Sequence, residues 1–263
     1  MKSPIPPKKS LGQHFLNDPN TARRIVGALE APADAHVVEI GPGVGALTGL
    51  LHGRFENFEA IEVDSRAVTH LRECYPDLNM RQADVLEMDW RNLGDLPLHI
   101  IGNLPYNITS PILFGLLAAY DVMSQAVLMV QREVAERIVA QPRTKAYGIP
   151  SVFAQLYARP SILFKVSRNV FEPKPAVESV VIRLDFEGVE APDVDTGLLH
   201  AVVRAGFGMR RKVLRNSLQK WAADIPDRWR RCRAEELSPA DYVMLARYFQ
   251  DRSQIIRDSL DNQ

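Results

Sequence analysis

The chain has few of the features that mark secreted, membrane-spanning or metal-dependent proteins. Its 263 residues include two cysteines, Cys74 and Cys232, which lie far apart and lack ligand-spaced partners, so neither a zinc site nor a disulfide framework is expected. The six histidines show no His-Glu-x-x-His arrangement, and we predict no metal site. The basic, proline-rich amino end lacks the apolar segment of a secretory signal, and no membrane span is evident. These absences favour a cytoplasmic protein with free thiols.

The chain also lacks a net charge, because 32 Lys and Arg residues balance 32 Asp and Glu residues. The basic residues are unevenly distributed: ten lie between Arg204 and Arg233, where only Asp224 and Asp227 oppose them. Local charge rather than total charge steers a polyanion, so this segment is a candidate RNA-binding region. A solvated basic helix face is the alternative. The candidates for substrate contact, which cannot all share one narrow helix face, are Arg210, Arg211, Lys212 and Arg215.

A glycine-rich segment follows the first strongly apolar run. Residues 37–40 predict a short buried strand, and Gly41-Pro42-Gly43-Val44-Gly45 predicts a sharp turn into a helix over 46–51. Such a turn lets a nucleotide-like ligand approach the backbone at a helix amino end. The turn is weak evidence by itself, and its spacing differs from the dinucleotide fingerprint, although Gly49 keeps a nicotinamide ligand as an alternative.

Acidic residues follow the next two predicted strands. The strand 60–64 ends in acids about 20 residues beyond the glycines, where a carboxylate accepts hydrogen bonds from ribose hydroxyls, and we assign that role to Glu62. Asp64 is instead a candidate cap for a helix that starts near Ser65. Asp84 follows a further short strand and is a candidate acceptor for the adenine amino group of the ligand, with a surface loop acid as the alternative.

The segment Asn103-Leu104-Pro105-Tyr106 follows the apolar run 98–102, at the expected carboxyl end of a buried strand. An exocyclic amine on a base is a poor nucleophile, which a side-chain carbonyl, a proline-fixed backbone carbonyl and an aromatic face can help. Asn103, Leu104 and Tyr106 offer these three groups, and we predict an amine-methylating site. A turn with a core tyrosine is the alternative.

The order of these segments predicts an α/β fold. Short apolar runs alternate with helical segments through about residue 186, which indicates a mostly parallel, doubly wound sheet. The glycine turn, Glu62, Asp84 and Asn103 each follow a strand, so we expect them to line one crevice. A polar, proline-containing linker is predicted over 188–194, and a small all-α domain follows over 195–263. Its predicted helices are 198–205, 212–222 and 240–249, the last with Ser238 as cap and Pro239 at its first position.

Longer motifs extend these patterns from near residue 8 to near residue 250. They are Leu11-Gly12-Gln13-His14-Phe15-Leu16, Glu39-Ile40-Gly41-Pro42-Gly43, 103–108, 130–135, 146–148, Phe171-Glu172-Pro173-Lys174-Pro175 and 210–218. With them the chain resembles the bacterial small-subunit (16S) ribosomal RNA adenine dimethyltransferases, and segment 210–218 is highly specific to that family. The resemblance implies a Rossmann-like class I S-adenosylmethionine-dependent methyltransferase domain over 1–187 and a helical RNA- and ribosome-binding domain over 195–263.

The resemblance also implies a reaction and a partner. Family members use S-adenosylmethionine to dimethylate N6 of two adjacent adenosines in a hairpin loop of 16S rRNA, in an assembling 30S subunit. At the position of His14 the family usually has Asn, and at Ala176 and Val213 it commonly has Lys and Thr. No exposed heptad pattern argues against a monomer. Carried over by position, the resemblance implies cofactor contacts from His14, Leu16, Gly41, Glu62, Asp84 and Asn103.

Roles for the remaining groups follow from the chemistry of the amine. The side-chain oxygen of Asn103 and the backbone carbonyl of Leu104 accept hydrogen bonds from the adenine amine and align it with the methyl group. Tyr106 stacks on the base. Phe171 covers the other face of the base or, equally compatible with the sequence, belongs to the core.

Three other functions remain as alternatives. The large-subunit RNA methylases that confer macrolide resistance share the cofactor site and the target atom, but Leu104 and segment 210–218 favour the small-subunit family. The same fold also serves in assembly or transcription factors that need no turnover. A nicotinamide-dependent dehydrogenase is distinguished by whether NAD or S-adenosylmethionine raises the melting temperature.

Overall fold

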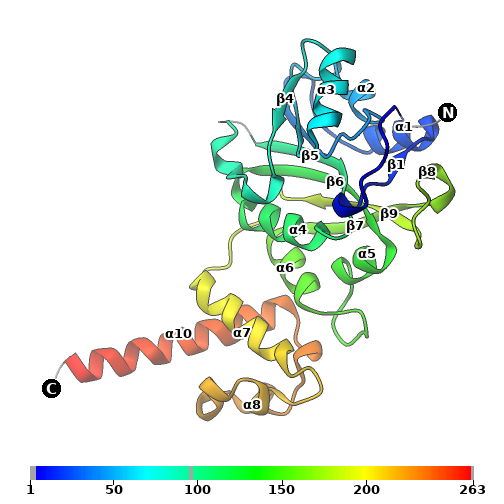
Figure 1. The fold of residues 1–263 in the computed structure, drawn as a ribbon. Helices are drawn as coiled ribbons and strands as arrows, with labels where there is room; N and C mark the ends of the chain where they lie inside the picture. Colours follow the sequence, from blue (N-terminus) through cyan, green and yellow to red (C-terminus); the bar gives the residue numbers. More distant parts are fainter. Residues whose placement is uncertain (1–3, 95–96, 262–263) are drawn as a thin grey trace. The chain divides into compact units, whose positions relative to one another are not determined.

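The computed structural model describes residues 4–94 and 97–261 and divides into two compact units (Figure 1). The first unit comprises Met1–Ala135 and Ala158–Gly188, and the second comprises Glu136–Tyr157 and Val189–Gln263. The predicted linker over 188–194 contains neither helix nor strand.

The first unit is built on a seven-stranded sheet with the strand order β4-β3-β2-β5-β6-β9-β7. The five strands from β4 to β6 are parallel, and β9 runs antiparallel to both β6 and β7. The predicted mostly parallel α/β sheet is therefore confirmed. The strands are β2 (His36–Ile40), β3 (Asn57–Glu62), β4 (Asn79–Gln82), β5 (Leu98–Asn103), β6 (Met123–Gln131), β7 (Arg159–Val166) and β9 (Ser179–Asp185).

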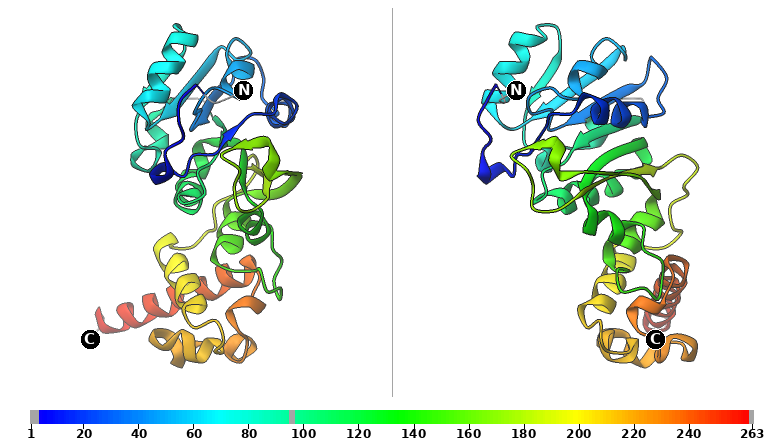
Figure 2. Two further views of the ribbon diagram at one scale, coloured as in Figure 1. Left: turned by 45° about the vertical axis from the view of Figure 1, so that its right-hand side comes forward. Right: turned by 90° about the vertical axis from the view of Figure 1, so that its right-hand side faces the viewer.

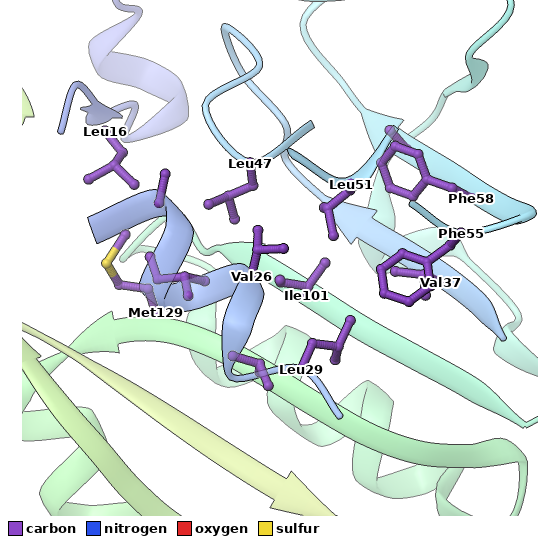
Figure 3. Packing of buried hydrophobic residues seen from close by; sticks show 14 of the residues in the cluster. Leu16, Val26, Leu29, Val37, Leu47, Leu51, Phe55, Phe58, Ile101 and Met129 are labelled. Atoms are coloured by element: carbon purple, nitrogen blue, oxygen red, sulfur yellow. The ribbon is translucent and has the colours of Figure 1, made fainter. Parts of the chain in front are cut away.

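The central strands carry near-continuous apolar runs because both of their faces are covered. Every second residue along these strands points to the same face of the sheet, and these residues pack into a large apolar cluster with the amino-terminal helices. Figure 3 shows Val26 of α1 beside Ile101 of β5 in this cluster. Side chains alternate between the two faces of a strand, so Glu39, Glu62 and Asn103 point to the same face as these core residues. They lie near the carboxyl ends of their strands.

The strand order contains a switch point between β2 and β5. From β2 the chain proceeds to β3 on one side, and from β5 it proceeds to β6 on the other. Since parallel crossovers are right-handed, the connecting helices lie on opposite faces of the sheet and the loops after β2 and β5 diverge. The divergence leaves room at the carboxyl ends of these two strands, where Gly41 and Asn103 lie.

The amino-terminal segment reaches this edge of the sheet through a short two-stranded ladder. Strand β1 (Phe15–Leu16) pairs antiparallel with β8 (Phe171–Glu172), which comes from a distant part of the chain, as the two views of Figure 2 show. Residues 8–16 are thereby held beside the loops that follow β2 and β5.

The helices of the first unit connect its strands. They are η1 (Lys9–Leu11), α1 (Pro19–Gly27), α2 (Thr48–Leu51), α3 (Ser65–Cys74), η2 (Val85–Glu87), η3 (Trp90–Asn92), α4 (Thr109–Ala118), η4 (Tyr120–Val122), η5 (Arg168–Val170) and the first half of α5 (Arg132–Ile138). Helix α2 begins two residues later than predicted, because the glycine turn continues through Gly45, whose φ is +90°. Strand β3 ends at Glu62 rather than at Asp64, because Asp64 caps α3.

The second unit is helical. Its elements are α6 (Ile149–Tyr157), α7 (Thr196–Gly208), α8 (Leu214–Ser217), η6 (Gln219–Asp224), α9 (Asp227–Arg230), η7 (Ala234–Glu236) and α10 (Pro239–Asp261). The start of α10 agrees with the predicted cap: the Asp241 amide donates to Ser238 Oγ at 3.1 Å, and the Ser238 amide donates to Asp241 Oδ2 at 3.0 Å. Pro239 is the first residue of the helix.

Three features of this unit differ from the sequence predictions. Helix α10 continues to Asp261, whereas the predicted helix ends at residue 249. The helix predicted over 212–222 is interrupted at Leu218, whose buried side chain and ψ of 45° separate α8 from η6. Segment 136–157, predicted as part of the first domain, groups with the second unit. Its helix α6 packs there because Phe153 contacts His200 edge-on at 4.5 Å and Tyr157 hydrogen-bonds the same ring at 2.9 Å.

In the part of the chain that the structure describes, no helix is both long and apolar enough to cross a membrane. Within the same residues, no three His, Cys, Asp or Glu side chains gather as a metal site would require. Cys74 and Cys232 are free thiols, as expected.

Candidate active site

A cleft of about 1050 Å³, counted out to its open mouth, lies at the switch point of the sheet. It is bounded by the amino-terminal segment, the glycine turn and the loops that follow β3, β4 and β5. The structure brings all the predicted catalytic and cofactor residues to its lining: His14, Leu16, Gly41, Glu62, Asp84, Asn103, Leu104 and Tyr106.

The glycine turn leaves the backbone open to the cleft. Gly41 has a φ of +65°, and a Cβ atom placed on it would meet nothing within 4 Å, so a side chain here would occupy cleft space. Gly43 also lies in the left-handed region, and a Cβ atom on it would approach the Phe15 ring at 3.0 Å. The turn therefore requires glycine both for its conformation and for close approach of a ligand.

Glu62 is a buried carboxylate that organises this turn. One oxygen accepts the backbone N–H of Gly43 at 3.1 Å, and the other accepts those of Val63 and Asp64, each at 2.9 Å. Burial raises the pKa of Glu62, and the three backbone donors oppose that shift. The carboxylate thus ties the loop after β3 to the glycine turn after β2 and retains acceptor capacity for ligand hydroxyls.

Glu39 is a second buried acid in the lining, which the sequence did not single out as a site residue. Its Oε2 accepts a hydrogen bond from Thr48 Oγ1 at 2.7 Å, and its side chain is 1% exposed. Burial, with the nearby Glu62 charge as a smaller cause, raises the pKa of Glu39 to about 8. Glu39 therefore holds its proton near neutral pH in the ligand-free protein.

We expect Glu39→Gln to be more stable than the wild type at pH 8 and nearly equal at pH 4.5. The pKa of Glu39 rises from 4.5 to about 8 on folding. The folded state therefore keeps a proton that the unfolded chain has released, and the wild type loses stability as pH rises across this window, at no more than about 1.4 kcal/mol per pH unit. Gln does not titrate and can still accept from Thr48. Urea unfolding of both proteins from pH 4.5 to pH 8.5 measures the difference, and parallel pH profiles would contradict it.

The other two acids near the cleft have capping roles. Asp84 lines the cleft, as predicted. It is also an exposed loop residue, as in the alternative prediction, and it accepts a hydrogen bond from the Leu86 amide at 2.9 Å as the cap of η2. Asp64 accepts hydrogen bonds from Arg66 and from Gln13 Nε2, which hold the pKa of Asp64 below its usual value. The capping alternative for Asp64 is confirmed. Gln13, which the sequence did not single out either, fastens the amino-terminal segment to α3.

Asn103 is oriented by the amino-terminal segment. Its Nδ2 donates to the backbone carbonyl of His14 at 2.9 Å. Because an amide nitrogen only donates and the amide oxygen only accepts, this contact leaves Oδ1 as the acceptor of the side chain. His14 thus contributes through its backbone as well as through its ring.

Tyr106 is held from two sides. Its hydroxyl hydrogen-bonds Ser179 Oγ at 2.7 Å, and its ring stacks with the His14 ring at a centroid distance of 5.4 Å and an interplanar angle of 29°. The His14 ring is fixed in turn by a 2.7 Å contact between Nδ1 and the Pro173 carbonyl. Ser179 is fully buried at the start of β9. The only sequence signal for it is a polar residue opening a buried strand.

We expect Ser179→Ala and Tyr106→Phe to lower the rate of methyl transfer by about 3- to 10-fold each, the value of one neutral hydrogen bond. Because both variants remove the same contact, their combination should cost little more than either alone. Tyr106→Ala also removes the ring and should lower the rate of methyl transfer by about 10- to 100-fold, which corresponds to the loss of one base-stacking contact. Cofactor affinity, measured by calorimetry, should change little in all four variants.

The opposite pattern, a large loss of cofactor affinity with an unchanged transfer rate at saturation, would contradict a role for Tyr106 toward the base. Additive losses in the double variant would contradict the Ser179 contact as the common cause.

The structure corrects the prediction that Phe171 stacks on a substrate base. Its side chain is 4% exposed, belongs to the apolar core cluster and pairs with Leu16 across the β1–β8 ladder. The core alternative is the one observed, because Phe171 anchors the strand that holds the amino-terminal segment in place.

Arg210 also differs from its predicted role in substrate binding. Its Nε pairs with Glu235 at 2.6 Å, and its Nη2 donates to the Lys145 carbonyl at 2.7 Å. These contacts fasten the loop before α6 to the carboxyl-terminal helices, so the guanidinium of Arg210 is occupied within the second unit. Arg211, Lys212 and Arg215 are exposed.

The charge of the cleft distinguishes between the two cofactors under consideration. The described lining contains no Lys or Arg, and its acids are Glu39, Glu62 and Asp84. Because Glu39 holds its proton near neutral pH, the acidic character of the lining comes from Glu62 and Asp84. An acidic lining attracts a cationic ligand and repels a pyrophosphate. The lining therefore fits a sulfonium such as S-adenosylmethionine better than a nicotinamide dinucleotide.

Comparison with known proteins gives the family. A model of the family described as ribosomal RNA adenine dimethylase matches residues 6–250. The chain belongs to this family. It is therefore a methyltransferase that dimethylates adenine in ribosomal RNA, with S-adenosylmethionine as the methyl donor.

Individual relatives agree with this assignment. A protein of Salinibacter ruber named ribosomal RNA small subunit methyltransferase A is 48% identical over 271 residues, which cover 98% of this chain and 90% of the relative. A protein of the same name from Bordetella avium is 40% identical over 247 residues, which cover 90% of this chain and 93% of the relative.

Solved structures share the fold of this dimethylase. A dimethyladenosine transferase from Plasmodium falciparum superposes with a TM-score of 0.79 at 23% identity, covering 91% of this chain and 98% of that one. The 23S rRNA methyltransferase ErmE superposes with a TM-score of 0.68 at 25% identity, and the match covers 89% of this chain and 98% of ErmE. The predicted class I S-adenosylmethionine-dependent methyltransferase fold with a carboxyl-terminal helical part is thus confirmed.

Proposed function

We propose that this enzyme dimethylates N6 of two adjacent adenosines in a hairpin loop near the 3′ end of 16S rRNA, in the assembling 30S subunit. The observation that carries the proposal is the 48% identity, over nearly the whole chain, to a small-subunit methyltransferase. We further propose that it acts as a monomer in the cytoplasm.

In this proposal the cleft at the switch point holds the cofactor. Glu62 accepts from the ribose hydroxyls, Asp84 from the adenine amino group, and the open backbone at Gly41 admits the ligand. Leu16 and the His14 backbone close the cleft from the amino-terminal side. S-adenosylmethionine supplies a methyl group on a positively charged sulfonium, and the acidic lining suits that charge.

The chain's own residues then align the amine. Asn103 Oδ1 and the Leu104 carbonyl accept the two amine hydrogens, directing the nitrogen lone pair away from them. The same two acceptors stabilise the positive charge that develops on nitrogen. The hydrogen bond from Asn103 Nδ2 to the His14 carbonyl keeps Oδ1 in the accepting position before substrate arrives. Tyr106, held by Ser179 and His14, supports the base by stacking.

The basic segment of the second unit contributes to RNA binding in this proposal. Arg211, Lys212 and Arg215 contact phosphates, while Arg210 keeps its structural contacts with Glu235 and Lys145. A variant with Arg211→Gln and Lys212→Gln should therefore bind rRNA with a shallower salt dependence and an unchanged unfolding midpoint. Arg210→Gln should instead lower the stability of the second unit.

The deciding experiment is methyl transfer from labelled S-adenosylmethionine to small subunits that lack the modification, followed by mass analysis of the digested RNA. Dimethyladenosine at two adjacent positions of 16S rRNA is the expected result. Transfer to large-subunit RNA alone would move the function to the resistance-type methylases. Tight subunit binding without transfer to either RNA would favour an assembly factor.

A further inference from the structure

Glu39 differs from the other acids of the cleft in having little to stabilise a negative charge. It is 1% exposed, and within the described structure its carboxyl group accepts one hydrogen bond, from Thr48 Oγ1 at 2.7 Å. Glu62 accepts hydrogen bonds from three backbone N–H groups, and Asp84 is exposed to solvent. Of the three acids, Glu39 therefore has the strongest preference for its protonated form in the ligand-free protein.

The surroundings of Glu39 supply no positive charge. Its paired residues on the adjacent strands, Ala60 of β3 and Ile101 of β5, do not ionise, and the nearby Glu62 is itself an acid. Burial in these surroundings raises the pKa of Glu39 to about 8. The other titratable groups of the described cleft lining are His14, Asp84 and Tyr106. A cation that enters the cleft is thus the missing counter-charge of Glu39.

We propose that Glu39 makes the cleft prefer the cationic cofactor to its neutral product. Its carboxyl group releases a proton when a sulfonium enters the cleft and regains one when a thioether remains. This role rests on the proposed placement of the cofactor in the cleft. It goes beyond that placement, because it gives Glu39 the discrimination between two ligands of nearly the same shape and different charge.

The attraction between opposite charges is large enough for this role. At an effective dielectric constant of about 20, a positive charge about 6 Å from a carboxylate lowers its pKa by about two. An acid that titrates near pH 8 in the empty cleft then titrates near pH 6 beside the cation. At pH 7 binding of the cation should therefore release about 0.8 proton from Glu39.

The proton balance of the reaction closes with Glu39 included. When the methyl group leaves the sulfonium, the bonding electron pair stays on sulfur, and the lone pair of the amine forms the new N–C bond. The amine gives one proton to solvent. The carboxylate of Glu39, which has lost its counter-charge, takes one proton from solvent. The product then faces a neutral acid, so the attraction that held the cofactor no longer opposes product release.

Calorimetry of the full chain without RNA measures the proton directly. Titrations at pH 7 in two buffers with different ionisation enthalpies compare S-adenosylmethionine with S-adenosylhomocysteine, the thioether product. The cofactor should release about 0.8 proton more than the product does. Glu39→Gln should abolish this difference, because glutamine does not titrate. Any titration that the two ligands share cancels in the comparison.

The affinity for the cofactor should show the same dependence on pH. Since the complex holds fewer protons than the free protein, affinity for S-adenosylmethionine relative to S-adenosylhomocysteine should rise by about 10- to 20-fold from pH 5.5 to pH 7.5. In Glu39→Gln the ratio of the two affinities should stay constant. Glu59→Gln is the matched control and should keep the rise, because Glu59 is a buried acid that pairs with His36 and Arg81 outside the cleft.

Thr48 allows a second test that leaves the acid in place. Thr48→Val removes the donor that favours the ionised form, so the rise in relative affinity should move to higher pH and shrink to about threefold between pH 5.5 and pH 7.5. Thr48→Ser keeps the hydroxyl and should restore the rise of the wild type. A merely structural role for the contact between Thr48 and Glu39 predicts equal losses for both ligands at every pH.

Three results would overturn this role of Glu39. They are equal proton release by the two ligands in the wild type, a difference that persists in Glu39→Gln, and an affinity ratio that does not change with pH. Persistence in Glu39→Gln would indicate another group of the lining, such as His14 or Glu62. If Glu62→Gln binds the cofactor as the wild type does, the proposed placement itself fails. If Glu62→Gln binds it more weakly and the wild type releases no proton, only the role of Glu39 fails.

Discussion

Asn103→Ala is expected to reduce methyl transfer to rRNA by about 100- to 1000-fold, the effect of removing one oriented acceptor from developing charge. The side chain has a fixed orientation, because its Nδ2 donates to the His14 carbonyl at 2.9 Å. Alanine removes the acceptor while leaving the glycine turn and Glu62 intact. Cofactor affinity should therefore change by less than about tenfold, the value of a neutral hydrogen bond.

Asn103→Asp tests the orientation itself. Aspartate retains an acceptor oxygen, but the atom that faces the His14 carbonyl becomes a second oxygen, and the two repel each other. We expect a loss of transfer comparable to that of Asn103→Ala. Asn92→Ala is the control, because Asn92 is an exposed asparagine that contacts Asp89 rather than the cleft. Single-turnover rates with saturating cofactor measure all three, and wild-type rates in Asn103→Ala would refute the assignment.

The second large effect is expected from Glu62→Gln, which should weaken binding of S-adenosylmethionine by about 10- to 100-fold, the value of a hydrogen bond to a charged group. A glutamine has one acceptor oxygen where Glu62 uses two. If that oxygen serves Val63 and Asp64, the amide nitrogen faces the Gly43 N–H, which is itself a donor. The glycine turn is then no longer tied to β3, and one buried donor is unsatisfied.

A matched pair of caps controls for local destabilisation. Asp84 and Asp89 cap η2 and η3 in the same manner, but only Asp84 lines the cleft. Asp84→Asn should weaken cofactor binding by less than about tenfold, and Asp89→Asn should leave it unchanged. Isothermal titration of the four proteins is the measurement. Equal affinities of Glu62→Gln and the wild type would exclude Glu62 from the cofactor site.

The corrections share one physical cause, which is that sequence patterns do not report side-chain partners at long range. Phe171 has the composition of a stacking residue, yet strand pairing with β1 buries it in the core. Arg210 has the charge of an RNA ligand, yet Glu235, 25 residues away in the chain, pairs with it. The helix predicted over 212–222 has helical spacing, yet it breaks at buried Leu218.

The sequence by itself determined the parallel α/β sheet, the glycine turn, the order of the strand-end residues and the family, because periodicity, turn chemistry and motifs are local properties of the chain. Only the tertiary structure decided how those residues are held. The His14 carbonyl that orients Asn103, the Ser179 hydroxyl that holds Tyr106 and the shifted pKa of Glu39 depend on contacts between distant segments and on burial. Such contacts and burial exist only in the folded chain.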